Sequence, residues 1–460
     1  MTFLNLFFIT YYVSIFLYVF KKISLGDLKY LLFFICAALP IYFIIQVQVF
    51  QISNSAIFVN ILKFSKDFLF FYALLIFIAG RKNSFIRKNL NFTIVDKLLL
   101  SFLFIVFIFT LFPIGEANFI SRILYSKNIL IILITYFIGR NIEIDYNFYK
   151  LITNTLIFVF ISATIFSSFE FISETHFHSL IDYSNFKSNF NLLDPQGNYG
   201  LNWTFESQDT KPRYGSFFAD PLEFSASIIF FLSVILYYLY FDFKKKYIVL
   251  IGLIILSLYL SFSRGAIVSC LGVVFISLLI NKKFRFLINM FFLTIVTSFL
   301  TYYFSSSEIK YLIIDTLKFQ NSSSLGHLVE WIEGIISIIE NPLGIGLAMS
   351  GNAFGVDQSV KVGGENQFII YGVQMGIITL FIYALSIIMI VYRGIKVYLK
   401  SNEFYFKHIA FTVICTKFGL ILPLLTANAE LYLFVSLASW FLAGYTESKF
   451  IKLEHTNFQS

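Results

Sequence analysis

Two arginines stand beside or inside apolar runs of this sequence. Arg264 lies within SFSRGAIVSCLGVVF, residues 261–275, and Arg213 precedes the apolar run that begins near residue 217. A charge at the centre of a membrane helix costs about 2.5–3.5 kcal/mol on insertion scales. A guanidinium is a permanently charged, rigid fork that matches phosphate oxygens. The pair therefore predicts a site for a phosphorylated ligand at a membrane boundary.

Each arginine also has a simpler interpretation. A single arginine at a membrane interface often reaches lipid head groups and has no further role, and this alternative stays open for Arg213. A functional role is favoured for Arg264, because Gly265 after it permits a tight turn or a close backbone approach. Lys361 is a further cation near the start of an apolar run.

Glu365 is the first candidate for a general base, and His327 is the second. An ionised carboxylate accepts a hydroxyl proton when it is positioned correctly. Glu365 precedes the run that begins at residue 367, so the alternative is that it caps a helix there. The alternative for His327 is an ordinary surface histidine near Trp331.

Metal chemistry is not favoured. Asp220 and Glu223 have the spacing of a metal pair, but we expect one of them to orient Arg213 or to cap a helix whose first turn holds Pro221. His176 and His178 show no third ligand by spacing. The sequence predicts no metal and no cofactor.

The composition places these residues in a membrane protein. Of 460 residues, 58% are hydrophobic and 13% are charged, and the mean hydropathy is +0.80. A soluble domain carries about 25% charged residues. The net charge of +8 forms no basic stripe outside apolar runs, so nucleic acid is not an expected partner. Cys36, Cys270 and Cys415 lie within apolar runs and are expected to pack there.

Runs of roughly 20 apolar residues predict about 12–13 transmembrane helices in an all-α polytopic protein. The thirteen predicted spans lie near residues 3–20, 30–48, 56–79, 98–113, 127–139, 150–170, 217–241, 247–262, 265–280, 286–304, 367–391, 408–425 and 430–446. Most lysines and arginines then gather on one side, which is expected to be cytoplasmic. The N-terminus is predicted outside and the C-terminus inside.

Two long polar segments fall on the predicted outer side. The predicted organisation is N-terminal transmembrane helices over 1–171, a first long extracytoplasmic loop over 172–216, helices carrying the Arg264 turn over 217–304, a second long loop over 305–366, and C-terminal helices with a cytoplasmic tail over 367–460. Loops of this length are commonly functional, so we expect the chemistry on that side.

Three segments in this order resemble the O-antigen ligase and polymerase superfamily. They are RYGSFFADPLEFSASIIFFLSVIL, LSFSRGAIVSCLGVVFISLLI, and HLVEWIEGIISIIENPLGIGLAMSG followed by ENQFIIYGVQMGIITLFIYAL. Together they span roughly residues 211–395. The resemblance implies a GT-C-like membrane fold and a metal-independent, inverting glycosyltransferase. The donor would be a glycan on undecaprenyl pyrophosphate at the outer face of the bacterial inner membrane.

The resemblance also implies roles for individual residues. Arg213 and Arg264 would bind the pyrophosphate, and Glu365 or His327 would take the proton of the acceptor hydroxyl. Supporting or substrate-binding positions would be Gly215, Asp220, Gly265, Trp331, Lys361 and Asn366. Trp331 would stack on sugar or lie in the interface belt.

One departure from the ligase pattern favours a polymerase. Ligases carry histidine immediately before the asparagine of the second outer loop, whereas this chain has Glu365–Asn366, with His327 where relatives often have arginine. A polymerase of O-antigen or capsule would act beside the bilayer with a chain-length regulator and a flippase. A ligase acting on lipid A-core and a lipid-linked oligosaccharide flippase remain alternatives. The flippase would need charges within spans, where Lys63, Lys66, Asp67 and Lys417 are the candidates.

Overall fold

The computed structural model describes residues 2–81, 92–190, 194–207, 210–304, 310, 314, 322–351, 356 and 361–457. Parts of both predicted long loops lie outside these residues. The described ranges form helices and one isolated bridge between Glu206 and Pro212, with no β-strand.

The helices are α1 Thr2–Ser24, α2 Tyr30–Ala38, η1 Leu39–Ile41, α3 Tyr42–Ser53, α4 Ala56–Arg81, α5 Ile94–Leu111, α6 Phe119–Arg140, α7 Tyr146–Ser173, α8 Phe177–Leu180, α9 Tyr183–Phe190, η2 Trp203–Phe205, α10 Pro221–Phe241, α11 Lys245–Ser261, α12 Arg264–Ile280, α13 Phe284–Phe304, α15 Ser322–Glu340, α16 Gln367–Met375, α17 Ile377–Lys400, α18 Phe404–Gly419, α19 Ile421–Thr426, η4 Ala429–Leu431 and α20 Leu433–Asn457.

The all-α polytopic class predicted from the sequence is confirmed. Nine helical segments in the described part of the chain are long and apolar enough to cross a membrane. They are α1, α2–α3, α5, α6, α7, α10, α13, α17 and α18–α19. The other four predicted spans are also helical, as α4, α11, α12 and α20, but they do not reach the same length and hydropathy.

Short or charged stretches explain why those four helices differ from the rest. α11 and α12 have 17 residues each. α4 carries the charges of Lys63, Lys66 and Asp67 in its first half, and α20 ends in a polar segment. The predicted span over 367–391 is also divided, because α16 ends at Met375 and α17 begins at Ile377.

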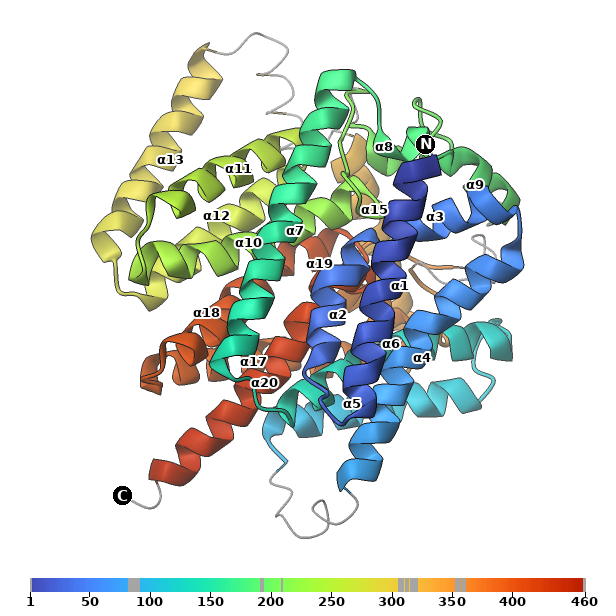
Figure 1. Cartoon of the computed structure of the whole chain (residues 1–460), viewed down its shortest axis with the longest axis horizontal. Helices are drawn as coiled ribbons and strands as arrows, with labels where there is room; N and C mark the ends of the chain where they lie inside the picture. The colour runs from blue at the N-terminus through green and yellow to red at the C-terminus, as the bar shows by residue number, and fades with distance from the viewer. Residues whose placement is uncertain are drawn as a thin grey trace.

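Successive long helices run in opposite directions between two ends of the bundle. We call the end that carries the described parts of residues 174–220 and 341–366 the loop face. The opposite end carries the short connections 25–29, 141–145, 242–244, 281–283 and 401–403. The start of α1 lies beside α8, where Phe8 contacts Phe177, and the C-terminal end of the chain lies at the far side of the molecule (Figure 1).

The core is densest where α20 crosses α6. Gly139 of α6 lies against the backbone of Phe441, and Gly444 of α20 lies against the backbone of Tyr136. Small residues at such crossings let helix backbones approach closely, which increases van der Waals contact in a membrane bundle. Trp440 is fully buried beside this crossing.

Ion pairs hold the helices together near the opposite end. Arg140 of α6 pairs with the fully buried Asp96 of α5 at 2.7 Å, and the Tyr136 hydroxyl donates to the same carboxylate at 2.9 Å. Arg393 of α17 pairs with Glu447 of α20. A buried carboxylate is tolerated only when it is paired and hydrogen-bonded, and Asp96 meets both conditions.

Candidate active site on the loop face

Arg264 is the first residue of α12 and lies at a tight turn. α11 ends at Ser261, Phe262 adopts a left-handed conformation with φ 46°, and the Ser263 hydroxyl accepts the backbone N–H of Ala266 at 3.3 Å. The Arg264 side chain is exposed at the loop face. Neither the tight turn nor a close backbone approach requires glycine at position 265, because Phe262 supplies the left-handed residue and a Cβ at Gly265 would meet open space.

The segment that carries Arg213 is fastened to the end of α11. The Tyr214 N–H donates to the carbonyl of Leu260 at 3.1 Å, and the Arg213 N–H donates to the carbonyl of Phe205 at 2.8 Å. These bonds bring Arg213 and Arg264 into electrostatic contact. Burial, followed by the charge of Arg264, lowers the pKa of Arg213. Nε of Arg213 has no hydrogen-bond partner among the described residues.

Two arginines from separate segments therefore interact electrostatically at the loop face. Like charges at close range repel, and the repulsion grows as water is excluded. An anion bound between them would relieve this cost. The sequence could supply the two arginines but not their interaction, which depends on the backbone hydrogen bond from the Tyr214 N–H to the Leu260 carbonyl.

Asp220 caps α10, as one of the sequence alternatives predicts. Its Oδ1 accepts the backbone N–H groups of Leu222 and Glu223, each at 2.8 Å, and Pro221 occupies the first turn. Gly215 packs closely against the backbone at Asp220 and Pro221. Desolvation raises the pKa of Asp220 despite these bonds. We therefore assign Asp220 a structural role, in which it caps the start of α10 beside the segment that carries Arg213.

The described residues contain no group of three side chains able to hold a metal ion. Burial lowers the pKa of His176 to about 4 and that of His178 to about 3. Both imidazoles are therefore neutral near pH 7. His178 Nε2 lies 2.9 Å from the carbonyl of Phe218, so it serves the packing of the loop.

Glu365 and His327 are in direct contact. His327 lies on α15, and its Nδ1 forms an ion pair with Oε2 of Glu365 when the imidazole is protonated. The alternative that Glu365 caps the following helix is wrong, because Oδ1 of Asn366 accepts the N–H groups of Phe368 and Ile369 at 3.0 and 3.2 Å. The two base candidates, which the sequence offers separately, thus form one unit.

Further carboxylates surround this pair. Burial, followed by the charges of Glu365 and Glu333, raises the pKa of Glu330. Trp331 packs with Ile338, Ile369 and Val373, which joins α15 to α16, and its indole N–H has no partner among the described residues. Lys361 is half-buried at the start of residues 361–366, the segment that leads into α16.

A glycine turn fixes α15 against the break between α16 and α17. The N–H groups of Ile345 and Gly346 donate to the carbonyls of Val373 and Gln374 at 2.9 and 3.1 Å, and the Ile377 N–H donates to the carbonyl of Pro342 at 3.0 Å. Gly376 sits at the break with φ 87°. This arrangement sets the position of His327 relative to Glu365, because both helices share the turn.

Tyr432 connects the two parts of the site. It lies between η4 and α20, and burial, followed by the charges of Asp220, Glu223 and Glu365, raises its pKa well above the ordinary value. Asp220 and Glu365 therefore both interact electrostatically with the Tyr432 side chain. Tyr432 could not be selected from the sequence, because one of 28 tyrosines carries no distinguishing spacing.

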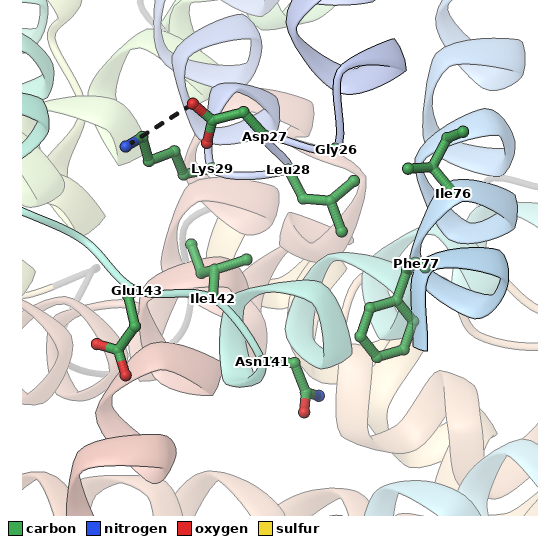
Figure 2. A pocket seen from close by; sticks show the side chains of 10 residues that line it. Gly26, Asp27, Leu28, Lys29, Ile76, Phe77, Asn141, Ile142 and Glu143 are labelled. Carbon is green, nitrogen blue, oxygen red and sulfur yellow. Dashed lines mark ion pairs between the residues drawn. The ribbon is translucent and has the colours of Figure 1, made fainter. Parts of the chain in front are cut away.

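Two of the larger cavities in the described part of the chain lie elsewhere, at the opposite end of the bundle. One has a volume of about 290 Å³ and is shown in Figure 2, where Lys29 and Asp27 pair across its edge. Its lining comprises Gly26, Asp27, Leu28, Lys29, Ile76, Phe77, Gly80, Asn141, Ile142 and Glu143. The other, of about 490 Å³, lies between the ends of α10, α12, α17 and α18. Neither contains a residue of the loop-face site.

Comparison with known protein families agrees with the resemblance seen in the sequence. Residues 247–384 match the family model described as O-Antigen ligase. This range runs from α11 into α17 and includes Arg264, His327 and Glu365, whereas Arg213 and Tyr432 lie outside it. No curated protein matches the chain. The predicted resemblance to the O-antigen polymerase and ligase superfamily is confirmed over these residues.

Proposed function

We propose, from the premise that residues 247–384 form an O-antigen ligase-family domain in a multi-pass membrane protein, that the chain polymerises a bacterial surface polysaccharide. It would transfer a growing glycan from undecaprenyl pyrophosphate onto the next lipid-linked repeat unit. The observation that carries the proposal is the backbone hydrogen bond from the Tyr214 N–H to the Leu260 carbonyl, which ties the Arg213 segment to the turn that carries Arg264. A cationic pair at a membrane boundary suits a lipid-borne diphosphate.

The arginines would stabilise the leaving group. The acceptor hydroxyl oxygen attacks the anomeric carbon from the face opposite the diphosphate, which inverts the configuration. The bond between that carbon and the diphosphate oxygen breaks, and its electron pair leaves with the diphosphate. Preformed cations aimed at developing charge usually make a large contribution to catalysis. Two guanidinium groups can supply this charge without a metal ion.

Glu365 would accept the proton that the acceptor hydroxyl loses. Its contact with His327 restrains the carboxylate. A restrained base loses less conformational entropy when it reaches the reactive geometry. His327 would act as the positioning residue, and it is also the second candidate for the base. Trp331, Lys361 and Asn366 lie on the same two segments and would shape the acceptor side.

The reaction would take place outside the cytoplasm. We propose that the loop face is extracytoplasmic and that the lysine-rich connections face the cytoplasm of a bacterial inner membrane. Lipid-linked repeat units must then be delivered to the loop face, so a flippase and a chain-length regulator are the expected partners. No cofactor is required by this chemistry.

An O-antigen ligase is the second candidate function. The matched family model bears that description, and His327 places an imidazole against the residue that precedes Asn366. Glycan analysis of a deletion strain separates the two. Loss of a polymerase leaves a single repeat unit on the acceptor, whereas loss of a ligase leaves long chains that are not attached.

Arginine variants test the proposal directly. Arg213→Gln and Arg264→Gln should each lower the transfer rate by about 10²–10³, so that long polymer disappears while the protein stays in the membrane. Lys211→Gln is the matched control, because Lys211 is an exposed cation two residues from Arg213. Full-length chains from either arginine variant, at wild-type protein levels, would contradict the leaving-group role.

A further inference from the structure

A second group of cations lies within the loop-face half of the bundle. Lys63 and Lys66 come from α4, Lys127 from α6 and Lys187 from α9, and we call these four residues the lysine cluster. Lys66 Nζ lies 2.8 Å from Oδ1 of Asp67, and Lys127 Nζ lies 2.5 Å from Oδ2 of the same carboxylate. Three helices distant in sequence therefore direct their lysines to one place.

The cluster has more positive charge than its described surroundings balance. Lys63 is repelled by Lys187, Lys127 and Lys66 together. Asp67 is the carboxylate that Lys66 and Lys127 share, and Asp220 attracts Lys187 from the side of the candidate active site. Only 7% of Lys66 is exposed. Gathering like charges away from water is costly unless an anion offsets them.

An unpartnered hydroxyl points to the same place. Tyr42 of α3 is buried, and its ring lies 5.6 Å from Nζ of Lys66. Its hydroxyl makes no hydrogen bond within the described part of the chain. Buried polar groups in native proteins nearly always have a partner, so this hydroxyl indicates water or a bound ligand beside Lys66 and Asp67.

The cluster lies within the bundle, below the start of α4. Lys63 and Lys66 lie about 10–15 Å along α4 from its start at Ala56, given a rise of about 1.5 Å per residue. Phe190 of α9 lies 4.3 Å from Nζ of Lys63 and covers the cluster from the loop side. The cluster thus lies below the loops and not on the open surface.

The cluster is connected to the candidate active site through Asp220. Lys187 interacts with Asp220, and Asp220 and Glu365 both act on Tyr432. The arginine pair lies at the other side of this arrangement, where the Gly215 backbone packs against Asp220. The lysine cluster and the arginine pair therefore both neighbour the segment around Asp220.

We propose that the lysine cluster binds the phosphate groups of the second lipid-linked glycan, the one that accepts the growing chain. This inference rests on the proposed function, because only a polymerase holds two such lipids at once. The acceptor diphosphate keeps its charge throughout the reaction. Lysine ammonium groups can hold it as point charges, whereas the leaving diphosphate benefits from the rigid arginine fork.

Native mass spectrometry of the purified full chain with undecaprenyl pyrophosphate tests the proposal. Wild type should bind two lipids per chain. Lys63→Gln and Lys187→Gln should each leave one, and Lys63→Arg should restore the second. Lys150→Gln is the control, because this exposed lysine lies at the opposite end. Lys66 is avoided because its loss would leave Asp67 without one of its partners.

The outcomes separate this inference from the proposed function. One lipid bound by wild type, or two still bound by both lysine variants, overturns the inference. The inference is also overturned if phosphatidylglycerol displaces the second lipid as readily as undecaprenyl pyrophosphate does, because the cluster would then bind any anionic lipid. Arg213→Gln should remove the other diphosphate. If it does not, the leaving-group assignment is wrong whatever the lysine variants show.

Discussion

At the scale of single residues, contact between Glu365 and His327 changes what the sequence can say about the base. The sequence supplies both residue types and the reason each could accept a proton, but it presents them as alternatives. Their contact depends on how α15 docks beside the start of α16. Asn366 takes the capping role that the sequence also allows for Glu365. Local pattern thus predicts candidates, whereas tertiary contact decides how they combine.

A double-mutant cycle at these two residues should show strong coupling. Glu365→Gln should slow elongation strongly while the chain still binds lipid-linked substrate, and His327→Gln should slow elongation less. Residues in contact typically couple by about 0.5–3 kcal/mol, so the double variant should elongate no more slowly than Glu365→Gln alone. The measurement is the elongation rate of each variant in membranes of equal protein content.

Glu333→Gln is the matched control, since this exposed carboxylate lies on the same helix as His327. Additive losses from the two single variants would show that Glu365 and His327 act independently. Unchanged elongation in Glu365→Gln would remove it as the base.

At the scale of elements, helix identity was predictable and helix breaks were not. All thirteen apolar runs are helical in the described residues, because hydrophobic length is a strong signal in a membrane protein. The run over 367–391 gives no sign of its division. Gly376 is required there because the turn from Pro342 to Gly346 bonds to the backbone on both sides of it.

Gly376→Ala should disrupt the loop-face site. Its φ of 87° disfavours any other residue, and a Cβ would lie 2.6 Å from the carbonyl oxygen of Pro342. Backbone strain of this kind costs about 1–3 kcal/mol, so the melting temperature in detergent should fall together with activity. Gly326→Ala on α15 meets open space and should melt like wild type. Equal melting of the two variants would show that the turn does not need glycine.

At the scale of the whole molecule, composition and charge asymmetry predict the class and the alternation of the chain. They do not predict which distant segments converge. Tyr432 and the lysine cluster lie in sequence segments that carry no recognisable motif. Their interactions form only when α4, α6, α9, α10 and α20 pack together. Such contacts join residues hundreds of positions apart, and no local signal records them.

Cysteine labelling should show that the two ends of the bundle face different compartments. Thr175 at the loop face and Lys245 at the opposite end are both exposed. Thr175→Cys should react with a membrane-impermeant maleimide in intact cells, and Lys245→Cys only after permeabilisation. The native Cys36, Cys270 and Cys415 are buried and free, so wild type should give little background. The reverse pattern would invert the proposed orientation.

The position of the two arginines relative to the matched range has a consequence for protein engineering. Arg264 lies inside residues 247–384 and Arg213 lies before them, although the two side chains act on each other. A chimaera that receives residues 247–384 from a relative would take the relative's residue at the position of Arg264 and keep the host's Arg213. Specificity transplants should therefore begin upstream of residue 205, so that the hydrogen bond from the Arg213 N–H to the Phe205 carbonyl is preserved.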